Sequence, residues 1–590
     1  MPDWSYHGIF KPILSKIPSY MSREFIHKGM SIIASLPLGP HIINFIGREE
    51  CSPLLNKQIN GLDLANPIGL SGKIDPYLTG TTAFTNLGFG FIEIGPVTLH
   101  MEIRSSYPIV NHNEQRIEFS SPLESIGLER TIVKLKEVRK KQPLIIALSG
   151  KPEELLVMME KLDPFADGYV MNSEEYDPTI HIYKPIFISN PTIEWVHTLN
   201  VNHITGIVVE EDEFTTLLST VRSYKEHFPS LSIVTSGGIH EPWQALSLLK
   251  IGAELVLLSD GYVFSGPGLT KRINEALLDE INEQTPPQKG WLSYWYFGLF
   301  IFLGGLFALL FSLTSVILPY DELFLEMERN TIAGFNDRIM KFMSHDRMTL
   351  AGTMISGGIV YTQLAYHGVR KRLLWAKQSI DIAAITGFMG IFLFIGFGYF
   401  DWLHLLFWLA LLPFYLYGCI HTKEIKGAPS STNRRNHKIW LQSLIGQLAF
   451  VVLGFSFVLG GLIISYLGVT SVFVPTDLLY LCMPPAMLDE FNQNLIPVIA
   501  HDRAGFGSAL LSVGLLVLTL SLWGFQQGNK WVWWTLLIGG LPAFIAGIYI
   551  HFAIGYTSFI HLLPAYFAIC LFLIGLVKSH SFFHKNQDHF

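Results

Sequence analysis

The feature that most constrains this chain is a series of uncharged, apolar runs that begins at Trp291. Each run is about 20 residues long, enough for a helix to cross roughly 30 Å of hydrocarbon. Residues 1–290, in contrast, alternate charged and apolar residues as a globular domain does. The sequence therefore predicts a globular domain followed by an integral membrane domain.

The apolar runs predict eight membrane-spanning helices. The expected spans are 291–318, 349–367, 380–400, 402–420, 440–467, 505–525, 531–550 and 557–577. An even number of crossings returns the C-terminus to the side on which the membrane domain begins. Membrane lipid is therefore an expected partner.

The loops between these spans predict the orientation, because Lys and Arg accumulate in cytoplasmic loops. The 368–379 and 421–439 loops are rich in basic residues, whereas the 469–503 loop holds only Arg503. The first 20 residues also lack the apolar core of a signal peptide. We therefore expect a protein of the cell membrane whose N-terminal domain and C-terminus are cytoplasmic.

Composition excludes several classes of protein. Hydrophobic residues make up 49% of the chain and charged residues only 15%, with a mean hydropathy of +0.35, which excludes a disordered or nucleic-acid-binding chain. Four scattered cysteines and the lack of a CxxC pair argue against a disulfide framework or a cysteine zinc site. The net charge of −7 indicates no particular partner.

The globular half has the pattern of an α/β barrel. Residues 5–46 predict short amphipathic helices interrupted by prolines. From about Gly61, short apolar runs typical of buried parallel strands alternate with helical stretches. At least seven such strands over about 220 residues favour a (β/α)8 TIM barrel over an open sheet.

Two segments of this half carry a family resemblance. Residues 65–98, ANPIGLSGKIDPYLTGTTAFTNLGFGFIEIGPVT, resemble the opening of a class 2, membrane-associated dihydroorotate dehydrogenase. Residues 233–269, IVTSGGIHEPWQALSLLKIGAELVLLSDGYVFSGPGL, are similar to the flavin-phosphate segment of that family. The resemblance spans about residues 5–285 and places the N-terminal helices where the family has its quinone tunnel and membrane contact.

The resemblance implies FMN as a cofactor and a membrane quinone as electron acceptor. The implied FMN-binding residues are Gly237, Gly238, Ser259, Asp260 and Gly261, with Thr98, Lys151 and Lys73 near the ring. The physical pattern agrees, because turns after two late barrel strands present backbone N–H groups at a common phosphate position. The alternative is that these glycines serve only the turns, since Gly adopts positive φ without strain.

The substrate motifs of the family are degenerate here. The asparagine-rich stretch that binds orotate corresponds to IEFSSPLESIGLER, which contains no asparagine, and Phe187 lies near the place of the flavin-supporting lysine. Only Asn172 and Ser173 match the loop that carries the catalytic serine, and Ser173 equally suits a loop-capping hydroxyl. A site that binds its substrate by hydrogen bonds is selective, because a polar group left unpaired is costly. Without the asparagine amides, we expect the substrate to be changed or lost, and pyrimidine biosynthesis is one open role.

The membrane half contains an internal repeat. When residues 301–347 are shifted by 156 positions onto 457–503, 17 of 47 positions are identical without a gap. After one inserted residue, His404 aligns with His561. Four crossings per copy predict an all-α domain of two parallel four-helix repeats, which belong to no family that we recognise.

Several of the shared polar residues are expected at the outer face. They are Asp321, His345, Asp346, Arg347 and His404 in the first copy and Asp477, His501, Asp502, Arg503 and His561 in the second. One interpretation is a helix-start cap with a snorkelling arginine. The other is a site in each repeat, where His345 with His404, or His501 with His561, binds a metal or carries protons beside Asp321 or Asp477.

These patterns divide the chain into N-terminal helices (1–55), a barrel (56–285), and two membrane repeats (291–441 and 442–590). The leading hypothesis is a membrane-bound flavin oxidoreductase with an altered, unidentified small-molecule substrate. The second is an inactive barrel that serves as a cytoplasmic sensor or scaffold. The third is a membrane half that is itself a transporter or enzyme with histidine sites.

Overall fold

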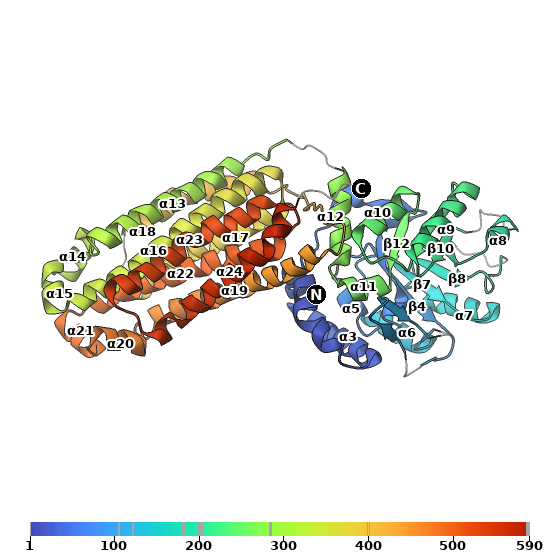
Figure 1. Ribbon diagram of the computed structural model, residues 1–590, viewed down its shortest axis with the longest axis horizontal. Helices are drawn as coiled ribbons and strands as arrows, with labels where there is room; N and C mark the ends of the chain where they lie inside the picture. The colour runs from blue at the N-terminus through green and yellow to red at the C-terminus, as the bar shows by residue number, and fades with distance from the viewer. Residues whose placement is uncertain are drawn as a thin grey trace. The chain divides into compact units, whose positions relative to one another are not determined.

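The computed structural model describes residues 2–103, 107–120, 123–178, 183–198, 204–281, 286–397, 399 and 402–585. It separates into two compact units, Met1–Asn282 with Ala428–Leu444, and Glu283–Gly427 with Ile445–Lys585. We call them the barrel unit and the helical unit and describe each by itself (Figure 1).

Eight parallel strands form a closed barrel in the barrel unit, as the sequence predicts. They are β3 (Ile68–Leu70), β4 (Phe91–Val97), β7 (Leu144–Leu148), β8 (Gly168–Asn172), β9 (Ile186–Ser189), β10 (Gly206–Glu210), β11 (Ser232–Ser236) and β12 (Leu255–Leu258). The helices that follow strands are α5 (Thr81–Phe84), α6 (Leu128–Glu137), α7 (Pro152–Leu162), α8 (Ile193–Thr198), α9 (Phe214–His227), α10 (Pro242–Lys250), α11 (Asp260–Ser265) and α12 (Leu269–Ile281).

The interior of the barrel is packed with apolar side chains. Alternate residues of neighbouring strands form one buried cluster, which includes Phe91, Phe187 and Val208. A hairpin of β1 (Lys57–Ile59) and β2 (Leu62–Leu64) adds its apolar residues to the same cluster. The barrel is therefore solid below its mouth, and polar chemistry is confined to the carboxyl ends of the strands.

The N-terminal residues form short helices against the barrel. They are α1 (Asp3–Ser5), η1 (Tyr6–Phe10), α2 (Lys11–Leu14), α3 (Ser19–Ser35) and α4 (Gly39–Gly47). Helices α3 and α4 meet at an angle of 115°. Large apolar side chains are exposed on α3 and in the turn before α4, among them Phe25, Ile33 and Leu38. The pair therefore has the composition of a segment that contacts lipid.

The helical unit contains long apolar helices. Those long and apolar enough to cross a membrane, among the described residues, are α13 (Trp291–Thr314), α18 (Trp402–His421), α19 (Lys438–Gly468), α22 (Leu495–Trp523), α23 (Lys530–Ile554) and α24 (Phe559–His584). Two further expected spans coincide with α16 (Asp337–Gln363), which begins with several charged residues, and α17 (Leu374–Met389), which has 16 residues. Six of the eight expected crossings thus have a matching apolar helix.

Four short helices lie at one end of the helical unit (Figure 1). They are α14 (Pro319–Leu325), α15 (Arg329–Phe335), α20 (Pro475–Leu481) and α21 (Pro485–Phe491). The Phe335 and Phe491 rings stack with centroids 3.8 Å apart. Asn336 donates to the Leu481 carbonyl at 3.0 Å, and Asn492 donates to the Leu325 carbonyl at 2.8 Å. Residues that align in the internal sequence match therefore make matching contacts.

Residues Ala428–Leu444, which include most of the segment between α18 and α19, belong to the barrel unit. Arg434 forms an ion pair with Asp279 of α12 at 2.8 Å. Asn436 donates to the His240 carbonyl at 3.0 Å and accepts from Arg272 at 2.6 Å. This part of the basic 421–439 loop is thus fixed on the barrel by buried polar contacts.

Candidate functional site

Two glycines follow β11 at the mouth of the barrel. Gly237 and Gly238 have φ angles of +83° and +58°, which residues other than glycine rarely adopt. A Cβ on Gly237 would lie 2.4 Å from the Glu211 carbonyl oxygen, and one on Gly238 would lie 2.9 Å from the Phe214 nitrogen. The backbone therefore makes a tight turn at the predicted phosphate position.

The next strand ends in Ser259, Asp260 and Gly261, where α11 begins. Asp260 is buried, and its Oδ1 accepts a hydrogen bond from the Gly261 N–H at 2.8 Å. The Asp260 carboxylate thus accepts the hydrogen bond from an N–H group that would otherwise be available to a bound phosphate. The backbone cradle suits a phosphate, but the Asp260 side chain opposes one while it is ionised.

Burial is the main reason that the pKa of Asp260 is raised. His240, whose Nε2 lies 4.0 Å away, and the Gly261 N–H act in the opposite direction, while the carboxylates of Asp212 and Glu210 raise the pKa further. Burial also lowers the pKa of His240. The Asp260 carboxyl therefore takes up a proton more readily than an exposed aspartate does.

Other acidic groups line the same mouth. Lys73, in the turn after β3, forms an ion pair with Glu210 at the end of β10. Burial raises the pKa of Glu93 in β4 to about 7, with Lys73 lowering it and Glu210 raising it. Lys73 is thus committed to a carboxylate, and the sequence did not predict this acidic character.

The remaining residues implied by the resemblance lie at the rim. Thr98 follows β4 and its hydroxyl donates to the His100 carbonyl at 2.5 Å. Lys151 caps α7 and is exposed. Asn172 ends β8, is exposed, and lies 3.4 Å from Glu175 Oε2, while Ser173 is half-buried beside it. The fold brings these residues to the end of the barrel that carries Gly237 and Asp260, but none of them has a contact that indicates a role.

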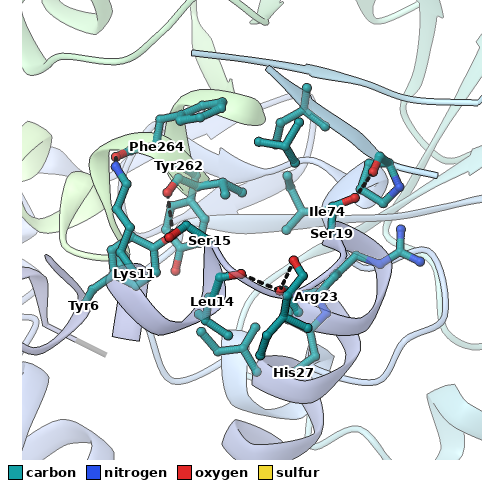
Figure 2. A pocket seen from close by; sticks show the side chains of 18 of the residues that line it. Tyr6, Lys11, Leu14, Ser15, Ser19, Arg23, His27, Ile74, Tyr262 and Phe264 are labelled. Carbon is teal, nitrogen blue, oxygen red and sulfur yellow. Dashed lines mark hydrogen bonds between the residues drawn. The ribbon is translucent and has the colours of Figure 1, made fainter. Parts of the chain in front are cut away.

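A cavity of about 450 Å³ lies between the N-terminal helices and the barrel (Figure 2). Its wall is mainly apolar and includes Ile26, Met30 and Phe84. Lys73 also lines it, so the cavity reaches the residue that is paired with Glu210 at the mouth. The N-terminal helices thus enclose a pocket where the resemblance implies a quinone tunnel.

Two basic side chains of α3, Arg23 and His27, line this cavity, and Figure 2 shows both on one helix. Arg23 forms an ion pair with Glu124 at 2.8 Å. His27 Nδ1 lies 3.3 Å from Asp75 Oδ1. The sequence analysis missed both residues, although their spacing of four places them on one face of a helix.

The histidines of the helical unit do not pair as the sequence analysis expected. His345 faces His551 and His561, with ring centroids 4.3 Å and 5.8 Å away. His404 instead faces His501, at 5.0 Å. The expected pairs, His345 with His404 and His501 with His561, were therefore wrong. Each pair was expected within one copy of the internal sequence match, whereas His345 and His404 each lie beside histidines of the second copy.

The arginines and aspartates also connect the two copies. Arg347 contacts Asp321 at 2.9 Å and Asp502 at 2.7 Å. Arg503 contacts Asp477 at 2.5 Å and Asp346 at 3.4 Å. Tyr399 donates to Asp321, and Tyr556 donates to Asp477. These contacts form two buried triads, Asp321–Arg347–Asp502 and Asp477–Arg503–Asp346, at the end of the unit that carries the short helices. We refer to the two triads together as the ionic network.

No family model matches the chain. Its N-terminal part is similar to the dihydroorotate dehydrogenase (quinone) of Thermosynechococcus vestitus, with 23% identity over 304 residues, which cover 40% of this chain and 84% of the relative. The enzyme of the same name from Kineococcus radiotolerans is 20% identical over 345 residues, which cover 46% of this chain and 93% of the relative.

Among solved structures, dihydroorotate dehydrogenase of Eimeria tenella in complex with ferulenol aligns with a TM-score of 0.38 and 15% identity. The alignment covers 44% of this chain and 91% of that structure.

Proposed function

We propose that the barrel unit, which is a class 2 dihydroorotate dehydrogenase-like domain, is a flavin-dependent oxidoreductase that delivers electrons to a membrane quinone. Its curated relatives are quinone-linked enzymes. The helical unit has six helices that suit a membrane span. Together these features support a membrane-bound enzyme whose electron acceptor is dissolved in the bilayer.

The observation that carries this proposal is the cavity under α3. A quinone has an apolar ring, two carbonyl oxygens and an isoprenoid tail, so it needs an apolar pocket with a few donors. The cavity offers an apolar wall together with Arg23 and His27. Its outer helices expose apolar side chains such as Phe25, which suits access from lipid.

The turn of Gly237 and Gly238 and the start of α11 at Ser259–Gly261 would hold the phosphate of FMN. A bound flavin would supply hydride acceptance from the substrate and electron transfer to the quinone. Lys73 and Thr98 would lie toward the ring, and Lys151 at the rim. The condition is a protonated Asp260, because an ionised carboxylate beside a phosphate is repulsive.

The substrate of this enzyme is proposed to be neutral or cationic. Glu93 and Glu210 lie at the mouth, and Lys73 is paired with Glu210. A carboxylated pyrimidine would meet these carboxylates without the asparagine amides that the family uses. Ser173, which directly follows β8, keeps the proposed role of proton acceptor, and Asn172 at the end of β8 would be a hydrogen-bonding neighbour of the substrate.

Replacing Asp260 by serine is expected to increase the affinity for FMN by about tenfold or more at neutral pH, which equals about 1.4 kcal/mol. The substitution removes a negative charge from the phosphate position. Wild-type affinity should rise as the pH falls through the raised pKa of Asp260, because the carboxyl becomes neutral. Flavin fluorescence titrations of both proteins measure this.

The serine variant is the control for the pH dependence of the wild type, because the titration of the FMN phosphate affects both proteins equally. An unchanged FMN affinity in Asp260→Ser, or a wild-type affinity that falls toward acid pH more steeply than that of the variant, would contradict the placement.

The second candidate function is a scaffold without redox activity. It is favoured by the buried Asp260, which opposes a phosphate while it is ionised. It is also favoured by the segment 428–444, which belongs to the barrel unit and pairs with it through Arg434 and Asp279. A barrel that binds no flavin in either the wild type or Asp260→Ser would support this second function.

A further inference from the structure

Three histidines from three helices meet in the helical unit. His345 of α16, His551 of α23 and His561 of α24 each offer one ring nitrogen, and these atoms all lie within 4.8 Å of one another. His345 and His551 are 5% and 7% exposed. Buried histidines that converge from separate elements are a common arrangement of metal ligands.

The hydrogen bonds of the first two histidines determine which nitrogen faces the cluster. His345 Nδ1 lies 2.9 Å from Asp346 Oδ1, and His551 Nδ1 contacts the Gly547 carbonyl. Carboxylate and carbonyl oxygens only accept, so both Nδ1 atoms carry the hydrogen. In a neutral ring of this kind, Nε2 carries a lone pair and no hydrogen. The Nε2 atoms of His345 and His551 are 3.0 Å apart.

The third histidine is held in the same way. His561 Nδ1 lies 3.1 Å from the Tyr556 hydroxyl oxygen. Tyr556 donates its hydrogen to Asp477 at 2.7 Å, so its oxygen accepts from His561. This leaves His561 Nε2 as a third lone pair. A hydrogen-bonded outer partner that orients the ring is characteristic of metal-binding histidines.

Four buried aspartates lie in the same part of the helical unit. Asp321, Asp346, Asp477 and Asp502 are at most 5% exposed. They contact the guanidinium groups of Arg347 and Arg503, and Asp346 and Asp502 also contact the Nδ1 atoms of His345 and His501. Asp346 therefore lies behind one of the three histidines, as the carboxylate partner of a metal-binding histidine does.

We propose that His345, His551 and His561 bind one divalent first-row transition-metal ion, with Zn(II) as the reference ion. Imidazole nitrogens lie about 2.0–2.1 Å from zinc, and three protein ligands leave a fourth position for water or a small molecule. A cavity of about 640 Å³ is lined by Thr476 and Tyr556, which both contact His561.

The histidines of the other pair provide an internal comparison. His404 and His501 face each other, and the two residues that align with His551 are Phe394 and Ile395, which have no ligand atom. The three-histidine arrangement therefore arises at one of the two equivalent positions, and a stoichiometry of one ion per chain follows.

The test uses full-length protein in detergent, stripped with a chelator and titrated with Zn(II) and Co(II). We expect one Zn(II) per chain by elemental analysis and tetrahedral Co(II) absorption. His551→Gln and His561→Gln, made separately, are expected to weaken binding at least about tenfold each, a loss typical of a removed ligand or its partner. His404→Gln is the matched control and should keep one ion per chain.

Thermal unfolding supplies a second readout, because an ion that binds only the folded state raises the melting temperature. Zn(II) should raise the melting temperature of the wild type and of His404→Gln, and not that of His551→Gln. Wild-type protein that takes up no stoichiometric ion would overturn the proposal and leave a shared proton between His345 and His551. Equal binding by His551→Gln and the wild type would overturn it as well.

Discussion

Replacing Arg503 by methionine is expected to destabilise the helical unit by about 3–5 kcal/mol, the cost of removing one partner from a buried ion pair. Arg503 is 7% exposed and donates to Asp477, to Asp346 and to the Val472 carbonyl at 2.6 Å. Its loss leaves two buried carboxylates without their guanidinium partner and the Val472 carbonyl without this donor. Thermal unfolding of the purified full-length protein measures the effect.

The matched control is Arg338→Met on α16. Arg338 is exposed and donates to the Tyr480 carbonyl at 2.7 Å, so its replacement should cost less than about 1 kcal/mol. In the double variant Arg503→Met/Asp477→Asn, part of the lost stability should return because one uncompensated charge is removed. Equal melting temperatures for Arg503→Met and Arg338→Met would contradict the ionic network.

Replacing Ile26 by tryptophan is expected to weaken quinone binding by about tenfold or more, which corresponds to about 1.4 kcal/mol. Ile26 lines the cavity under α3, and the larger ring would occupy the volume proposed for the quinone. A short-chain ubiquinone analogue, titrated against the full-length protein by fluorescence quenching, provides the measurement.

Phe25→Trp provides the control, because Phe25 lies on the same helix but is 67% exposed. This substitution should leave quinone affinity unchanged while adding the same fluorophore. Identical affinities in the Ile26 and Phe25 variants would show that the quinone does not occupy this cavity.

The barrel was predictable because each of its strands is a short apolar run with a helix after it. Such runs signal parallel strands whatever their exact sequence. The Gly237–Gly238 turn was likewise predictable, since its φ values require glycine. The environment of Asp260 was not predictable, because its raised pKa depends mainly on its burial in the folded chain and, to a smaller extent, on carboxylates from a different strand and the loop after it.

The histidine cluster illustrates a different difficulty. The sequence match identifies His345 and His561 because they recur, but it cannot tell which copy each one contacts. His551 has no counterpart in the other copy and was therefore missed. Its place ten residues before His561, at the end of an apolar run, was the available signal.

The absorption spectrum of the purified full-length protein, with mass analysis of the released cofactor, tests the central claim most directly. The account predicts the yellow spectrum of an oxidised flavin, FMN as the released compound, and reoxidation of the reduced protein by a short-chain quinone. Colourless protein that cannot be reconstituted with FMN, even at acid pH or with Asp260→Ser, would contradict the account and leave the barrel as a scaffold.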